Sequence, residues 1–175
     1  MTRQCLALSV IGPALTSASV SQGIPCSAAQ GWFTLMLRLP AACCAILYDS
    51  FSHRFVIQRN AGLKFSKQEY FQGLKAECET IRYINAAILG GSFSRSTHEA
   101  LILSVLCMAS NTRDETVWLR QKFSPFNAPL KKLQCLDIYG TLVLHPAHAQ
   151  GLIRLVQLHG GLKEIVTVGL AAIIS

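Results

Sequence analysis

The stretch SKQEYFQGLKAECETIRYINAAILGG, residues 66–91, decides the fold class of this chain. Ser66 and Glu69 have the spacing of a capping box, in which each side chain satisfies a backbone donor at a helix start. Residues behind this start recur at steps of three and four and predict one buried helix face, made of Phe71, Leu74, Cys78, Ile81, Asn85 and Ile88, with Ile84 beside it. On that face Asn85 is expected to make a helix–helix hydrogen bond. Gly90 and Gly91 predict the helix end, because glycine readily adopts the left-handed conformation that closes a helix.

Two more helices are predicted on either side of this one. Pro40 is expected to open the earlier helix, since its fixed φ angle and missing N–H suit a first turn. The buried side of that helix is expected to contain Ile46, Leu47 and Tyr48, and its end is expected at residues 60–62. Ser96 and Glu99 predict a second capping box, followed by residues 101–109, which are apolar nearly all round and end at Asn111. Such a helix belongs at the centre of a bundle.

Helix signals continue through the rest of the sequence. Thr112 and Glu115 predict a third capping box, residues 124–129 a proline-containing loop, and residues 130–139 a helix that Gly140 ends. Pro146 is expected to open a helix with a buried stripe of Ala149, Leu152, Leu155 and Val156, and a last helix is predicted over residues 162–173. Strand alternation and hairpin dipeptides are missing from the sequence. The predicted fold is therefore all-α, a bundle or an array of antiparallel helices.

The composition fits one folded domain. The chain has 175 residues, of which 51% are hydrophobic and 14% charged, so there is ample apolar surface for a core and wholesale disorder is excluded. The net charge of +7 favours acidic partners such as nucleic acid or membrane headgroups but does not bear on the fold.

Residues 1–39 are interpreted as an irregular or disordered leader, and residues 40–175 as the helical domain. The leader carries no charged residue between Gln4 and Leu37, yet glycine, proline and serine interrupt its apolar run. A transmembrane helix needs about 20 mainly apolar residues, so no membrane anchor is expected. A targeting segment, a disordered leader and sequence foreign to the domain remain the alternatives, and the last two are favoured.

The seven cysteines do not have the spacing of a zinc site. Their number is odd, and they contain no C-x2-C pair that would place two thiolates on one ion. Cys78, Cys107 and Cys135 lie in apolar-periodic segments and are interpreted as buried, reduced side chains. The cysteines fit a reducing compartment better than a secreted disulfide scaffold.

Candidate chemistry is limited to histidine and cysteine. His145 and His148 are the candidate metal ligands, if Asp137 or Cys135 folds back to complete the site. The spacing is common by chance, and His148 can equally cap a helix or pack. His53 and His159 have no acidic partner nearby in sequence, and a Cys–His nucleophile pair stays open because such pairs meet only in the fold. Nucleotide-binding and hydrolase motifs are missing from the sequence.

Two sequence blocks carry a resemblance to a known family. The first comprises residues 75–85 and 98–109, and the second residues 124–140 followed by 148–162, with the pattern H-x-x-G-L-x-x-L-V-x-L-x-G-G-L. In this order the blocks resemble the helical regulatory (middle homology) region of fungal transcription factors, which lies C-terminal to a zinc binuclear-cluster DNA-binding domain. The resemblance covers residues 40–175. Its signature positions here are Asp137, Tyr139, Gly140, His148, Gly151, Leu152, Gly160 and Gly161.

The resemblance implies an all-α nuclear regulatory domain without catalytic residues or cofactor. It gives the signature residues packing roles: His148 lies in a first helical turn, Gly151 lets a neighbouring helix approach closely, and Gly160 and Gly161 reverse the chain. The cysteines here cannot form the binuclear cluster, so no direct contact with nucleic acid is expected. Family members also continue beyond the G-G-L element. The chain is therefore expected to be incomplete at its C-terminus, with apolar residues such as Leu170 and Ile173 uncovered.

The leading hypothesis is a non-enzymatic regulatory or interaction domain that binds a protein partner or itself. Its expected location is the nucleus, or the cytoplasm if no import partner carries it. Self-association at micromolar concentration is expected, and a monodisperse monomer by light scattering would count against it. Two alternatives stay open: a small helical enzyme that uses a metal or a Cys/His pair, and a membrane-associated or secreted protein led by its N-terminal segment.

Overall fold

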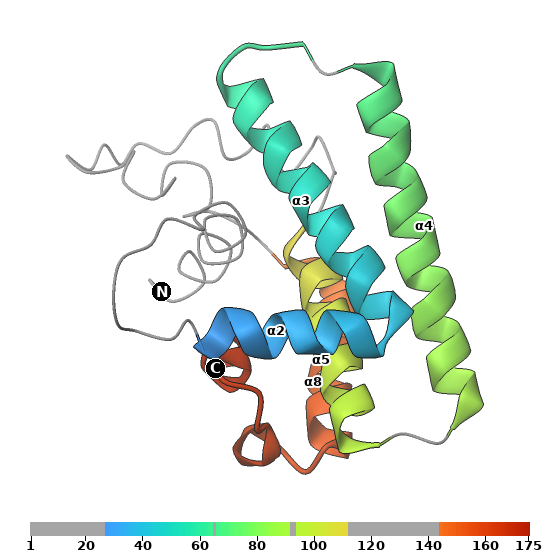
Figure 1. Cartoon of the computed structure of the whole chain (residues 1–175), viewed down its shortest axis with the longest axis vertical. Coiled ribbons are helices and arrows are strands. Elements are labelled where there is room, and N and C mark those ends of the chain that lie inside the picture. The colour runs from blue at the N-terminus through green and yellow to red at the C-terminus, as the bar shows by residue number, and fades with distance from the viewer. Residues whose placement is uncertain (1–26, 65, 92–93, 112–143) are drawn as a thin grey trace, which may run out of the picture.

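An antiparallel helix pair forms one side of the molecule in the computed structural model, which describes residues 27–64, 66–91, 94–111 and 144–175 (Figure 1). Helix α3 (Pro40–Asn60) begins at Pro40, after Leu39 in extended conformation, as predicted. Helix α4 (Lys67–Gly90) begins with the predicted capping box of Ser66 and Glu69 and ends at Gly91, whose φ of 66° is left-handed. The strongest sequence signals thus set both helix starts.

Helix α5 (Arg95–Ser110) is the centre of the bundle, as predicted from its apolar sequence. Its core residues are Ala100, Leu101, Ile102, Leu103, Val105, Cys107, Met108 and Ala109, all buried. Helices α2, α3, α4 and α8 all pack against it, and Asn111 ends it. Within the four described ranges every regular element is a helix, which confirms the all-α fold.

Helix α2 (Ser27–Arg38) corrects the predicted boundary of the leader at residue 39. Trp32 and Leu35 are buried in the core, and the Trp32 Nε1–H donates a hydrogen bond to the carbonyl oxygen of Val168, 3.1 Å away. Trp32, Leu35, Met36 and Leu39 have the i, i+3, i+4, i+7 spacing of an apolar helix face. The predicted boundary overlooked this face and followed Pro40, which starts a second helix rather than the domain. Residues 1–26 lie outside the described residues.

The C-terminal segment differs from the single helix predicted over residues 162–173. Helix α8 (Pro146–Leu158) forms as predicted and packs on α5, with Leu152 and Val156 buried. After it the chain makes a 3-10 turn, η2 (Leu162–Glu164), an extended stretch, and a short helix, α9 (Leu170–Ile174). Gly169 breaks the predicted helix, because its φ of 81° is left-handed.

The apolar residues at this end are covered. Leu170 is fully buried and Ile173 packs against the core, so the expectation that both would be uncovered is wrong. On α3, Ile46 and Tyr48 are buried as predicted, but Leu47 is exposed. No helix within the described part of the chain is long and apolar enough to cross a membrane.

The predictions for residues 112–143 lie outside the described residues. They comprise the capping box of Thr112 and Glu115, the loop over 124–129, and the helix over 130–139 with Gly140 at its end.

Candidate functional site

Most of the α4 face predicted to be buried is exposed, although Leu74 is half-buried and Ile84, predicted beside that face, packs against the core. The buried residues of this helix are Gly73 and Thr80, on the opposite side from the predicted face. The exposed fraction is 65% for Phe71 and 50% for Ile88, and Ile81, Cys78 and Asn85 are also exposed. The prediction that Asn85 makes a helix–helix hydrogen bond from a buried face is therefore wrong.

Small side chains occupy the buried side of α4. Gly73 and Thr80 are the buried residues of α4 and both are small, and the Thr80 hydroxyl is satisfied within the helix by the Ala76 carbonyl oxygen at 2.7 Å. Large apolar side chains at these two buried positions would displace the groups packed around them. Periodicity marks an apolar face correctly, but it does not say whether the rest of the same chain covers that face.

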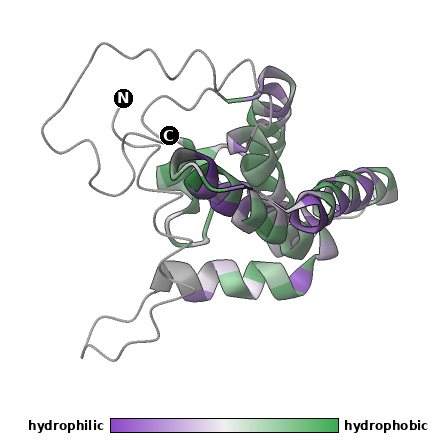
Figure 2. Cartoon of the chain, turned by 90° about the horizontal axis from the view of Figure 1, so that it is seen from above, coloured by the Kyte–Doolittle hydropathy of each residue, from purple (hydrophilic) through white to green (hydrophobic). Residues whose placement is uncertain are grey.

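The exposed apolar residues of α4 form one continuous strip, which we call the outer stripe. It comprises Tyr70, Phe71, Leu74, Cys78, Ile81, Ile88 and Leu89, with Asn85 among them; Leu74 is half-buried and the others are exposed. Helix α4 stands at the edge of the bundle, with α3 on one side and no described element beyond it (Figure 1). Seen from above, the helices carry both hydrophobic and hydrophilic residues (Figure 2). Contiguous apolar surface of this kind marks interaction sites.

Charged residues border the outer stripe. Arg82 pairs with Glu79 at 2.5 Å and lies over the ring of Tyr83, 4.2 Å from its centroid. At the start of α4, Arg54 pairs with Glu69 at 2.6 Å. An apolar centre with a charged border is the usual anatomy of a protein interface.

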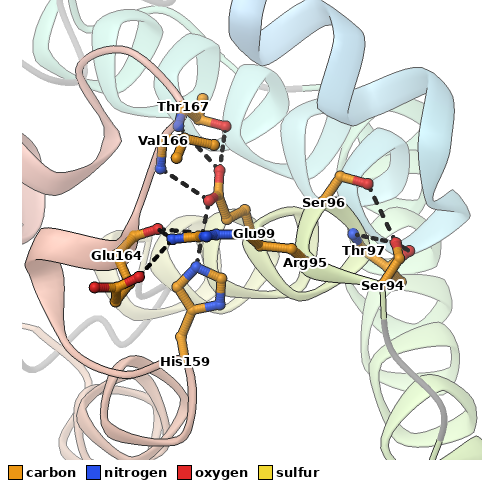
Figure 3. Close-up of polar contacts among 9 residues, drawn as sticks. All are labelled: Ser94, Arg95, Ser96, Thr97, Glu99, His159, Glu164, Val166 and Thr167. Carbon is orange, nitrogen blue, oxygen red and sulfur yellow. Dashed lines mark hydrogen bonds and ion pairs between the residues drawn. The ribbon is translucent and has the colours of Figure 1, made fainter.

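A buried carboxylate joins α5 to the C-terminal segment (Figure 3). Glu99 is 1% exposed and accepts hydrogen bonds from the backbone N–H groups of Val166 at 2.9 Å and Thr167 at 3.0 Å, and from the Thr167 hydroxyl. His159, 3% exposed, places Nε2 3.3 Å from Glu99 Oε1. We call Glu99, His159, Val166 and Thr167 the Glu99 cluster. It holds the extended stretch after η2 against the central helix.

The hydrogen bonds of the Glu99 cluster favour the ionised carboxylate. Burial has the largest effect and raises the pKa of Glu99. The bonds from Thr167 and Val166 and the nearby His159 together outweigh burial, so the pKa lies below its ordinary value. The imidazole of His98 packs edge-on against His159, with ring centroids 4.9 Å apart. Burial, helped by His159, lowers the pKa of His98 and favours its neutral form.

The Glu99 cluster replaces the predicted second capping box. The observed N-cap is Ser94, whose hydroxyl accepts from the Thr97 N–H at 3.2 Å, so the helix begins two residues earlier than predicted. Glu99 therefore lies beyond the first turn, on the buried side. Glu99 is the acidic partner of His159, although the two residues are 60 positions apart in the sequence. One feature of the sequence does indicate that Glu99 is buried: it directly precedes the apolar residues 100–103, on a helix that is apolar nearly all round.

A second buried carboxylate joins α3 to the end of α5. Asp49 Oδ1 accepts a 2.6 Å hydrogen bond from Asn111 Nδ2, which also donates to the Cys107 carbonyl oxygen at 2.8 Å. The Tyr48 hydroxyl donates to the backbone oxygen of Asn111. Burial raises the pKa of Asp49 to about 6, and the bond from Asn111 opposes that shift. These contacts join α3 to the end of α5, and the Asp49 side chain is buried.

The candidate metal ligands lie together at the start of α8. The rings of His145 and His148 have centroids 4.7 Å apart, and burial, assisted by His145, lowers the pKa of His148. The described residues contain no group of three or more histidine, cysteine or acidic side chains that could hold a metal ion. The predicted third ligands, Asp137 and Cys135, lie outside the described residues.

The signature residues within α8 and its end have the conformations expected of packing residues. His148 lies in the first turn of α8, Leu152 is buried in the core, and Gly160 and Gly161 have φ angles of 100° and 96°. Gly151 does not have its predicted role, because a Cβ there would meet Val105 Cγ1 only at 4.0 Å, an ordinary contact. Asp137, Tyr139 and Gly140 lie outside the described residues.

The described cysteines are all free thiols. Cys107 is buried, and that burial raises the pKa of its thiol well above the ordinary value, so it is an inert core residue. Cys43 and Cys44 are half-buried. Cys78 is exposed on the outer stripe, so its predicted burial is wrong.

Comparison of the chain with protein-family models, curated proteins and solved structures gave no match.

Proposed function

We propose that this chain is a non-enzymatic helical interaction domain that binds a protein through the outer stripe of α4. The single observation that carries this proposal is the exposure of Phe71, Ile81, Ile88 and Leu89 along one side of a 24-residue helix. Exposed apolar side chains gain free energy when a partner covers them, at about 25 cal/mol per Å² of apolar surface. Single exposed apolar residues are normal on protein surfaces, but a strip along a whole helix is not.

The polar clusters support a structural rather than a catalytic reading. Glu99 and His159 are almost fully buried, and the oxygen atoms of Glu99 are already engaged by backbone N–H groups and a hydroxyl. A catalytic acid or base must reach the proton it transfers. Asp49 is likewise buried and bonded to Asn111.

The regulatory part of the proposal rests on the sequence blocks that resemble fungal transcription-factor regulatory domains. In that setting the domain acts in the nucleus and affects transcription through a protein partner. The helical fold is compatible with this role but common to many others.

Alkylation of Cys78 tests whether the outer stripe is covered in the cell. N-ethylmaleimide is applied to cells that express the chain and to dilute purified chain, and modification is quantified on the tryptic peptide of residues 76–82. We expect Cys78 to react several-fold more slowly in the cell, because a bound partner shields it. The matched control is a Cys78→Ser/Ala86→Cys variant, whose new thiol lies on the exposed flank away from the stripe. Equal reaction of Cys78 in both settings would refute the proposal.

A further inference from the structure

The outer stripe has the seven-residue repeat of a coiled-coil seam. Phe71, Cys78 and Asn85 occupy one position of the repeat, conventionally a, and Leu74, Ile81 and Ile88 occupy the other seam position, d. Five of these six residues are apolar, and the sixth is asparagine. Two helices supercoil around each other when such a repeat runs along both.

We propose that the outer stripe is the seam of a parallel coiled coil formed by α4 helices from two copies of this chain. The inference rests on the proposed function and names the partner as a second copy. A two-fold axis along the seam brings identical residues together, so each copy offers the surface that the other needs.

Asn85 fits the parallel arrangement. In a parallel, in-register pair each a residue faces its own counterpart, so Asn85 meets Asn85 and the two amides hydrogen-bond across the seam. A single asparagine at an a position fixes register and a two-stranded state at some cost in stability. This assigns a role to a polar residue that is exposed in the middle of an apolar strip.

The charges next to the seam also favour parallel packing. Glu77 occupies the g position, and Arg82, five residues later, occupies e. Parallel packing brings Glu77 of one copy to Arg82 of the other, twice per dimer, in addition to the Arg82–Glu79 pair within each helix. Antiparallel packing would instead bring e residues together, and these are Lys75 and Arg82, which repel.

The core of each copy stays intact in this dimer. Gly73 and Thr80, the buried residues of α4, lie on the side of the helix turned away from the seam, and Ile84, at a flanking g position, packs against the core of its own chain. The helix is 24 residues long, or about 36 Å, which gives about three repeats. A seam this short with one asparagine predicts a weak dimer whose population depends on concentration.

The native Cys78 provides the decisive test. A parallel in-register seam holds two Cys78 residues within the roughly 4.4–6.8 Å Cα separation that a disulfide requires. Mild oxidation of the purified full chain by copper–phenanthroline in air should link two copies of the tryptic peptide 76–82, detected by mass spectrometry. Each chain has one Cys78, so this product can form only between chains. The Cys78→Ser/Ala86→Cys variant should not give the corresponding product through residue 86.

Charge exchange provides a second, independent test. Glu77→Lys and Arg82→Glu should each weaken dimerisation in sedimentation equilibrium by roughly tenfold, because each creates two like-charge contacts. The double variant should recover most of the lost affinity, whereas damage to folding alone would not be rescued.

Several results would overturn the dimer. These are a monomer at the highest soluble concentration, a dimer without the Cys78–Cys78 product, and two single charge variants that the double variant does not rescue. Protection of Cys78 in the cell without the disulfide product would assign the stripe to a different protein or to another segment of the chain. That outcome would refute the dimer but would still support a partner that covers the outer stripe. An unprotected Cys78 in the cell would refute the proposed function itself.

Discussion

Replacing Glu99 by glutamine should destabilise the fold by about 3 kcal/mol. Both carboxylate oxygens accept hydrogen bonds from buried donors, Oε1 from the Val166 N–H and Oε2 from the Thr167 N–H and hydroxyl. Glutamine keeps the volume but presents an NH2 group in place of one oxygen. Whichever way the amide turns, at least one backbone donor loses its acceptor, and the remaining bonds lose their charge assistance. Bonds to charged groups contribute about 1.5–3 kcal/mol each, and an orphaned buried donor costs about 1–3 kcal/mol.

Urea unfolding followed by circular dichroism measures this effect. At a slope of about 2 kcal/mol per M urea, a loss of about 3 kcal/mol lowers the midpoint by about 1.5 M. Glu164→Gln is the matched control, because Glu164 pairs with Arg95 at the surface, where such pairs contribute about 0–1 kcal/mol. A Glu99→Gln variant within about 0.5 kcal/mol of the wild type would refute the structural role of the Glu99 cluster.

The difference in unfolding free energy between the wild type and Glu99→Gln should depend on pH. The pKa of Glu99 lies below its ordinary value of 4.5, so the folded state favours the ionised form. The stabilisation is complete above pH 4.5 and is lost as the pH falls through the lower pKa of the folded state. The difference between wild type and Glu99→Gln should therefore be constant at neutral pH and shrink in acid. A difference that is unchanged in acid would show that the charge of Glu99 does not contribute.

Asp49, Trp32 and two glycines test the core and the turns. Burial raises the pKa of Asp49 from 3.8 to about 6, so the free energy of unfolding falls by about 3 kcal/mol as the pH rises across that range. Asp49→Asn should remove this fall, which urea unfolding at pH 4 and pH 7 measures. An unchanged pH profile in the variant would contradict the prediction. Trp32→Ala should cost about 3–5 kcal/mol in thermal unfolding, whereas a loss under about 1 kcal/mol would place α2 outside the cooperative domain. Gly160→Ala should lower the free energy of unfolding by about 1 kcal/mol or more, because φ there is 100° and a Cβ would lie 3.0 Å from the Glu164 side chain. Gly151→Ala should raise it by roughly 0.5–1 kcal/mol. Equal effects of the two substitutions would refute the distinction between these glycines.

The local signals in the sequence predicted the helix starts and ends well. The capping box of Ser66 and Glu69, the proline at position 40, and the glycines at 91 and 160 act within one helical turn. These residues start or end a helix through contacts with residues adjacent in the sequence, so the sequence alone is enough to predict their effect. The same holds for α5, whose all-round apolar surface has no place except the centre of a bundle.

Contacts between distant segments could not be predicted in this way. Glu99 meets Thr167 across 68 positions of sequence, and Asn111 meets Asp49 across 62. Ser96 and Glu99 have the spacing of a capping box, but they do not form one. The structure places the N-cap at Ser94. For α4 the repeat predicts an apolar face, but whether the same chain covers that face depends on distant segments, and in the structure the buried residues of the helix are Gly73 and Thr80.

The rate of Cys78 alkylation in living cells, compared between the wild type and Ile81→Ser, shows whether a partner covers the outer stripe. Ile81 is exposed, so serine leaves the fold intact but removes apolar contact next to Cys78. We expect a slow reaction in the wild type and a faster one in the variant, approaching the rate of the dilute purified chain. Identical rates in the two proteins would contradict the claim that the outer side of α4 serves to bind a partner.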